Sequence, residues 1–199
     1  YGAAHDAITF ECDNKDFDAK WQLGFSANSA DMPGTATLAT KKYRNLGFFM
    51  FSKNFGNAFT LNFTDLFETY ENGLSTAIYG RNTVGLNPVV NYKGLTFNGS
   101  FYYQHGTPAV FNTEDQYDAM MFTADLSYKT GILKAAVGYD YYSGEAYDDD
   151  QTDDKNKVFN TYMHGGHLFF GNTDFHLKLY GKNRGLTNIN FKLSADLSK

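Results

Sequence analysis

Alternation between apolar and polar residues is the dominant pattern along this chain. From position 17 the odd-numbered residues are Phe17, Ala19, Trp21, Leu23 and Phe25, and the even-numbered ones are Asp18, Lys20, Gln22, Gly24 and Ser26. A period of two places successive side chains on opposite faces of a strand. The pattern therefore predicts a β-strand with one apolar and one polar face.

The same alternation recurs over most of the chain. It is clear in the ranges 17–25, 59–63, 95–103, 120–128, 133–141 and 189–197, and weaker in 7–12, 44–53, 79–92 and 175–180. This predicts about ten strands of about 8–12 residues, a length that crosses a bilayer when the strand is tilted.

Turn residues separate the expected strands, and the connections fall into two classes. Short connections are predicted at 14–15, 54–57, 93–94 and 129–131, and long ones at 29–42, 106–116 and 144–157. Short and long connections alternate along much of the chain. This alternation is typical of a barrel with short turns on one side of a membrane and longer loops on the other.

Composition agrees with a strand-rich chain. Aromatic residues make up 18%, with 15 Tyr and 19 Phe, while Gly is frequent at 19 and Pro scarce at 3. The longest apolar run, Phe48 to Phe51, is far too short for a transmembrane helix. The mean hydropathy of −0.46 does not decide the class, because half of each barrel strand faces a polar lumen.

The apolar faces have two possible environments. In a soluble sandwich they pack against a second sheet, whereas in a membrane barrel they contact lipid. Two features favour the membrane. Charges occur at mid-strand, at Lys20, Asp125, Lys134 and Lys192, and tyrosines occur near strand ends, at 102–103, 128 and 141–142, where an interfacial aromatic belt is expected. The expected fold class is therefore all-β, an antiparallel transmembrane β-barrel in a bacterial outer membrane.

Several segments from about Lys42 onward resemble the alginate export family of outer-membrane porins. They are KKYRNLGFFMFSKNFGN at 41–57, YGRNTVGLN at 79–87, GSFYYQHG at 99–106, YDAMMFTADLSYK at 117–129, GYDYYSGE at 138–145, FNTYMHGGHLFFGNTDF at 159–175 and GLTNINFKLS at 185–194. The family pattern Tyr-Gly-x-x-His-x-Phe-x-Gly-x-x-Asp-Phe is kept at His167, Phe169, Gly171, Asp174 and Phe175.

This resemblance implies a large barrel, eighteen strands in the family, of which the chain supplies the middle and later part. Met163 and His164 depart from the family's Tyr-Gly. The alginate exporter's pore is strongly cationic, whereas the charges on this chain's polar positions are mixed in sign.

The chain is expected to form one domain over residues 1–199, incomplete as a barrel at both ends. Residue 1 is Tyr, not Met, and Leu197-Ser198-Lys199 lacks the terminal aromatic residue usual in outer-membrane barrels. Strands at 7–12 and 189–197 should then be sheet edges.

The expected function is passive passage of small polar or anionic solutes, such as sugars or sugar acids. The predicted pore-lining residues are Lys20, Arg81, Asn98, Asp125, Lys134, Asp140, Lys178 and Lys192. Rings of charge set pore selectivity, although facing Lys and Asp can equally pair as structural ladders. The alternative function is a non-conducting scaffold or binding partner in an envelope complex. Expected contacts are outer-membrane lipid, lipopolysaccharide and envelope proteins.

Other kinds of chemistry are disfavoured. A net charge of −5 without a basic cluster argues against nucleic acid, and the lone Cys12 cannot form an internal disulfide. The acidic loop 145–154 is a Ca²⁺ candidate but is better explained as a solvated loop, and His164, His167 and His176 are better explained as structural. No His-x-Ser or Gly-x-Ser-x-Gly segment occurs, so we predict neither an enzyme nor a cofactor.

Overall fold

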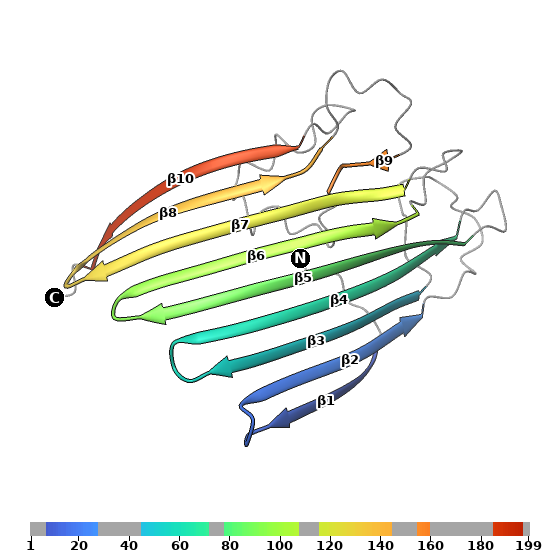
Figure 1. The fold of residues 1–199 in the computed structure, drawn as a ribbon, viewed down its shortest axis with the longest axis horizontal. Helices are drawn as coiled ribbons and strands as arrows, with labels where there is room; N and C mark the ends of the chain where they lie inside the picture. Colours follow the sequence, from blue (N-terminus) through green and yellow to red (C-terminus); the bar gives the residue numbers. More distant parts are fainter. Residues whose placement is uncertain are drawn as a thin grey trace.

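The structure, a computed structural model, describes residues 7–27, 45–71, 78–107, 116–144, 155–159 and 185–196, which form one antiparallel sheet (Figure 1). The strands are β1 (Ile8–Asn14), β2 (Ala19–Ala27), β3 (Asn45–Phe55), β4 (Phe59–Glu71), β5 (Ile78–Tyr92), β6 (Leu95–Gly106), β7 (Gln116–Thr130), β8 (Leu133–Tyr142), β9 (Lys155–Asn156) and β10 (Leu186–Ala195). These ranges contain no helix long and apolar enough to cross a membrane.

Strand order in the sheet follows the sequence. The order is β1-β2-β3-β4-β5-β6-β7-β8-β10, and every neighbouring pair is antiparallel. The two-residue strand β9 pairs in parallel with the start of β7. Within the described ranges β1 pairs only with β2 and β10 only with β8, so the two expected edge strands are edges of this sheet. The all-β, antiparallel part of the predicted fold class is confirmed.

The strand predicted from Phe17 begins later than expected. The Asn14 side-chain oxygen accepts hydrogen bonds from the backbone N–H groups of Asp16 and Phe17, both at 3.1 Å, which stabilises a turn over residues 15–18. Strand β2 therefore begins at Ala19 and not at Phe17. The strand predicted at 175–180 lies outside the described residues.

The two classes of connection lie at opposite ends of the sheet. The short turns β1–β2, β3–β4, β5–β6 and β7–β8 share one end, and the connections β2–β3, β4–β5, β6–β7 and β8–β10 share the other (Figure 1). This confirms the predicted alternation of short and long connections. We call these the short-turn end and the long-loop end.

Register collects most of the large apolar side chains of the nine long strands on one face, the apolar face. One cross-strand row contains Trp21, Phe51, Phe63, Leu86, Phe101, Phe122 and Tyr141. No described residue forms a second layer over this face, and Phe191 and Leu193 of β10 are 79% and 78% exposed. Phe101, which would be buried in a soluble sandwich, is 42% exposed.

Two charged residues interrupt the apolar face. Asp65 lies between Phe49 and Val84 in its row, and its carboxylate accepts a hydrogen bond of 2.8 Å from the Asn82 amide. Lys53 lies near the short-turn end, where its ammonium donates to the Phe17 carbonyl and stands 5.4 Å from the Phe55 ring centre.

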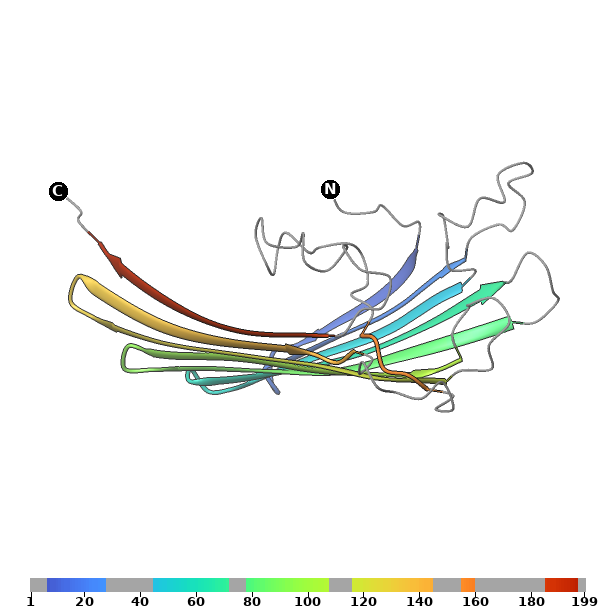
Figure 2. The same cartoon turned by 90° about the horizontal axis from the view of Figure 1, so that it is seen from above.

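The opposite face, the polar face, is the more buried of the two. Its side chains include the fully buried Glu68, Arg81 and Gln104, whereas most exposed large apolar residues lie on the apolar face. Figure 2 shows that the sheet is curved, with β1 and β10 rising toward the same side. Side chains converge on the concave side of a curved sheet, so the burial identifies the polar face as the concave one.

The hairpins are staggered by a constant step. Ala19 beside the first turn pairs with Lys53, two residues short of the second turn at Phe55. The same two-residue offset recurs between the later hairpins, where Phe59 pairs with Val90 and Leu95 pairs with Tyr128. From one hairpin to the next the turn shifts along the strands by two residues, each about 3.3 Å long, across two strand spacings of about 4.8 Å each. This shift corresponds to strands tilted by about 35° from the perpendicular to the line that joins the turns.

Two glycines provide a matched test of packing on the two faces. A Cβ at Gly85 would lie 2.2 Å from the Tyr102 ring, whereas a Cβ at Gly47 would meet nothing within 4 Å. We expect Gly85→Ala to lower the free energy of unfolding by about 1–3 kcal/mol through overpacking. Gly47→Ala should leave it unchanged or raise it by up to about 1 kcal/mol. Urea unfolding of both variants checks this, and equal losses would contradict the packing of Tyr102 over Gly85.

Candidate functional site

The polar face holds every predicted pore-lining residue that the structure describes. Cross-strand pairing places all of them on this face: Lys20, Arg81, Asn98, Asp125, Lys134, Asp140 and Lys192. Lys178 lies outside the described residues. The seven do not form one cluster, because they occupy different distances from the short-turn end.

Lysines gather on the polar face near the short-turn end. Lys129 and Lys134 are directly opposite each other on β7 and β8, and Lys192 lies one row further along on β10. Lys129 is 3.8 Å from Asp196, whereas Lys134 and Lys192 have no ion-pair partner among the described residues. Like charges directly opposite repel each other, so this corner favours an anion.

Lys129 was missed by the sequence analysis because it was assigned to a turn. The alternation of apolar and polar residues in β7 continues through Lys129 to Thr130, and this pattern could have placed Lys129 on the polar face.

On the other side of the sheet Lys20 pairs with Asp13 at 3.3 Å, and both side chains are exposed. Lys20 is therefore partly neutralised, unlike Lys134 and Lys192.

The middle of the polar face carries amides, hydroxyls and two carboxylates. One row contains Asn98, Asp125, Gly138 and Asn190 on four successive strands. A Cβ at Gly138 would lie 2.6 Å from both Asp125 Oδ1 and Asn190 Nδ2. The Asp125 and Asn190 side chains therefore converge over the bare backbone of Gly138.

The adjacent row, nearer the long-loop end, is also polar. Asn87 donates a 2.9 Å hydrogen bond to the Ser100 hydroxyl, and Asn188 donates one of 2.9 Å to Asp140. Thr123 lies between Ser100 and Asp140 in this row. The predicted pore-lining residues were charged apart from Asn98. Asn87, Asn188 and Asn190 were therefore missed, although the alternation of their strands places them on the same face.

Aromatic rings lie on the polar face beyond these rows. The Tyr102 ring covers Gly85, and the Tyr102 hydroxyl donates to Asn87 Oδ1 at 2.9 Å. Tyr102 and Tyr142 were predicted to belong to an aromatic belt with Tyr103 and Tyr141. That prediction is wrong for Tyr102 and Tyr142, because consecutive strand residues alternate between faces and only their neighbours lie on the apolar face.

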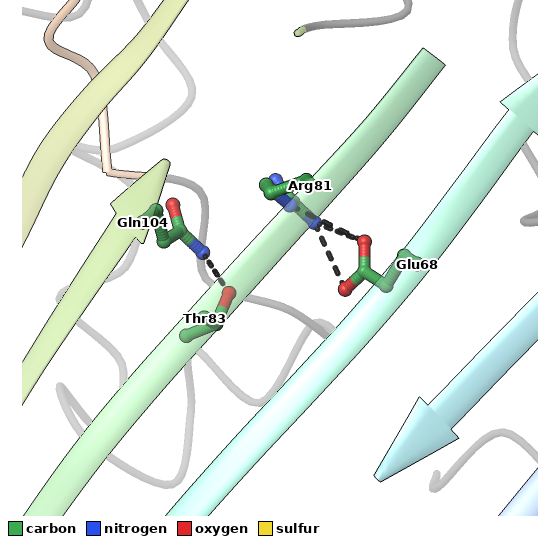
Figure 3. Close-up of polar contacts among 4 residues, drawn as sticks. All are labelled: Glu68, Arg81, Thr83 and Gln104. Atoms are coloured by element: carbon green, nitrogen blue, oxygen red, sulfur yellow. Dashed lines mark hydrogen bonds and ion pairs between the residues drawn. The ribbon is translucent and has the colours of Figure 1, made fainter. Parts of the chain in front are cut away.

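A buried ion pair occupies the polar face near the long-loop end (Figure 3). Arg81 Nη2 is 2.9 Å from Glu68 Oε2 and Arg81 Nε is 3.2 Å from the same oxygen, with side chains 2% and 0% exposed. The Tyr117 ring centre is 5.2 Å from the guanidinium, and Gln104 donates to Thr83 at 3.2 Å. Glu68 thus neutralises the charge of Arg81.

Phe159, which lies after β8 in the sequence, packs on the polar face at the same end. The Phe159 N–H donates to the Ser143 carbonyl at 3.2 Å, and the Phe159 ring lies edge-on to Tyr142, 6.0 Å between centres. Met121 and Ala119 complete a small buried apolar cluster. This cluster covers part of the polar face without a second sheet.

Metal chemistry has no site in the described part of the chain, where no group of three or more His, Cys, Asp or Glu could hold an ion. The acidic loop 145–154 and His164, His167 and His176 lie outside the described residues. Cys12 is half-buried and faces the apolar side opposite Trp21.

Comparison with known proteins gives no match to a family model, a curated protein or a solved structure. The alginate export resemblance therefore stays a prediction from its motifs. The family pattern at 163–175 lies outside the described residues, so the geometry of the polar face carries the functional argument.

The Glu68–Arg81 pair predicts a large effect of removing one partner. Arg81→Met removes the cation that pairs with the buried Glu68 carboxylate and should lower the free energy of unfolding by about 3–5 kcal/mol. The double variant Glu68→Leu, Arg81→Met should recover a substantial part of that loss. Lys20→Met breaks an exposed pair and should cost about 0–1 kcal/mol. Equal losses for Arg81→Met and Lys20→Met in urea unfolding would refute the structural role of the pair.

Proposed function

We propose that this sheet is part of the wall of a transmembrane β-barrel in a bacterial outer membrane and that the barrel conducts small polar or anionic solutes. The polar face lines the lumen and the apolar face contacts lipid. The observation that carries the proposal is the combination of an uncovered apolar face with a regular stagger of the hairpins. The stagger corresponds to a tilt of about 35°, within the range of closed barrels.

The height of the apolar face supports the same proposal. On β6 its apolar positions extend from Leu95 to Tyr103, after which His105 is polar, and on β7 they extend from Tyr128 to Met120, after which Asp118 is polar. Eight residue steps at that tilt span about 22 Å along the membrane normal. The apolar band of outer-membrane barrels is about 25 Å tall.

The edges of the sheet require further pairing in a membrane. β1 and β10 each pair on one side only within the described residues. Unpaired backbone groups in hydrocarbon cost several kcal/mol each, so both edges need partner strands. We propose that these partners belong to a larger barrel of the alginate export type, with the unpaired Lys134 and Lys192 giving a weak preference for anions.

One observation favours the second function, a non-conducting scaffold. The Phe159 cluster covers the polar face at the long-loop end, where a lumen would open. A barrel occluded there presents its surfaces to partners in an envelope complex and passes no solute.

Neighbouring residues on opposite faces of β7 test the membrane orientation. In a Cys12→Ser background, Asp125→Cys should react with a charged, water-soluble thiol reagent in proteoliposomes, whereas Leu126→Cys should be protected. Leu126 is 43% exposed in the isolated chain, so its protection requires a cover that the described residues do not provide, which in this proposal is lipid. In a urea-denatured control both cysteines should react. Equal reactivity in the bilayer would contradict the proposed orientation.

Conductance of the full-length protein in planar bilayers tests the channel. We expect an open conductance with weak anion preference, because the two unpaired lysines raise the local anion concentration. Lys134→Glu with Lys192→Glu should move the reversal potential in a KCl gradient toward cation preference, while Lys20→Gln should have a smaller effect. Absence of conductance in properly folded protein would support the scaffold instead.

A further inference from the structure

Three lysines on the polar face near the short-turn end lie within reach of one another. Lys129 and Lys134 are directly opposite on β7 and β8, and Lys192 of β10 pairs with Ala136, two residues beyond Lys134. Directly opposite residues have Cβ atoms about 4.5–5.5 Å apart, and diagonal neighbours are about 7–8 Å apart. The flexible four-carbon stem of a lysine can span such separations. We call Lys129, Lys134 and Lys192 the lysine corner.

Small and hydroxyl-bearing side chains lie among these lysines. Ala136 separates Ser127 from Lys192 in one row, and Ser194 is directly opposite Lys134 in the next row toward the short-turn end. Neither serine hydroxyl has a hydrogen-bond partner within the described ranges. The lysine corner therefore combines three ammonium groups with two hydroxyl donors around the short side chain of Ala136. Ammonium and hydroxyl groups are suitable donors to the oxygens of an anion.

The net charge of this corner matches a doubly charged anion. The Asp196 carboxylate lies 3.8 Å from the Lys129 ammonium, and the two side chains are 65% and 55% exposed. Three ammonium groups and this one carboxylate leave a net charge of +2. Because an exposed pair of this kind is weak, an anion can compete for Lys129. Asp125, the next carboxylate along this face of β7, is two side-chain rows further from the short-turn end.

An anion bound here relieves a repulsion that the register imposes. Like charges directly opposite in adjacent strands destabilise a sheet, as Lys129 and Lys134 do here. A dianion between them replaces this repulsion with charge-assisted hydrogen bonds, which are stronger than neutral ones. A singly charged carboxylate leaves half of the net charge of the corner uncompensated, and an uncharged solute leaves all of it.

We propose that the lysine corner binds a doubly charged phosphate group, either as inorganic phosphate or as the phosphate monoester of a small solute. A phosphate monoester at pH 7 carries about −1.5 to −2 charges and three strong acceptor oxygens, which suits the charge and the donors of the corner. This deepens the proposed function, on which it rests for access of the solute to the polar face. Among anionic solutes, it favours phosphates over sugar acids.

Binding of inorganic phosphate to the folded full-length protein tests the site. In isothermal titration calorimetry in neutral detergent at constant ionic strength, phosphate should bind saturably, and gluconate, a singly charged carboxylate, at least about tenfold more weakly. Lys134→Gln should raise the phosphate Kd about tenfold, because one hydrogen bond between charged groups is lost. Lys20→Gln is the matched control on the other side of the sheet, where Lys20 pairs with Asp13, and should leave the Kd unchanged.

Asp196→Asn should have the opposite effect. It raises the net charge of the corner from +2 to +3 and frees Lys129 from its partner, so the phosphate Kd should fall about two- to fivefold, the factor that corresponds to one exposed ion pair. Loss of the fold cannot produce tighter binding, so an unchanged or raised Kd in folded Asp196→Asn would contradict the site.

Glycerol 3-phosphate in the same titration distinguishes the two sources of the phosphate group. Binding similar to that of inorganic phosphate would support recognition of phosphate monoesters, whereas phosphate binding alone would support a site for the free ion.

Calorimetry also separates this inference from the proposed channel, because it requires no current. Phosphate binding that is weakened by Lys134→Gln and kept in Lys20→Gln supports the site even if planar bilayers are silent, an outcome that would overturn only the channel. An open conductance without phosphate binding would overturn the site alone. Equal affinity for gluconate and phosphate, or equal phosphate affinity in Lys134→Gln and Lys20→Gln, would also overturn the site.

Discussion

Cross-strand register is the constraint on which the other features of this protein depend. Each strand alternates apolar and polar residues, so a slip of one residue moves a strand's entire apolar set to the other face. The register that pairs Phe51 with Phe63 also places Arg81 opposite Glu68 and Asn98 opposite Asp125. A slip in one strand would therefore reverse its faces and break every cross-strand contact that it makes, whether in the apolar face, the ion pair or the polar rows.

The single sheet divides its stabilising interactions unequally between its two faces. On the concave polar face, side chains converge and bury the Glu68–Arg81 pair and the cluster around Met121 and Phe159. On the apolar face, rings contact their strand neighbours, as Phe49 contacts Phe63 at 6.1 Å between centres, but no layer covers them. Burial of apolar surface stabilises a fold by about 25 cal/mol per Å², but only for surface that is removed from water. The polar face is thus stabilised within the chain, whereas the apolar face gains its main stabilisation from lipid in the proposed membrane setting.

Sequence periodicity predicted the strands and their faces because a period of two is a local property. Which residues meet across strands depends on stagger, which the sequence does not display. For that reason the sequence predicted Arg81 as pore-lining without identifying Glu68 as its partner, and Asn190 was overlooked although it converges with Asp125 over Gly138. The turn at Asn14 was predicted, but its length depends on the hydrogen bonds that the Asn14 side chain accepts from the N–H groups of Asp16 and Phe17, and this shifted the start of β2.

Because of the stagger, each polar row rises obliquely along the axis of the proposed barrel and does not form a level ring. Asn62 is the third residue beyond Phe59 at the short turn of β4, whereas Asp140, in the same row, is the seventh beyond Leu133 in β8. Each strand step along a row of a wall tilted by about 35° rises about 2.8 Å along the barrel axis, so the row from Asn62 to Asn188 climbs about 14 Å. That is more than half of the apolar band on the outer face. A solute that exchanges hydrogen bonds from one strand to the next along this row therefore advances along the axis of the proposed pore while it stays in contact with the polar row.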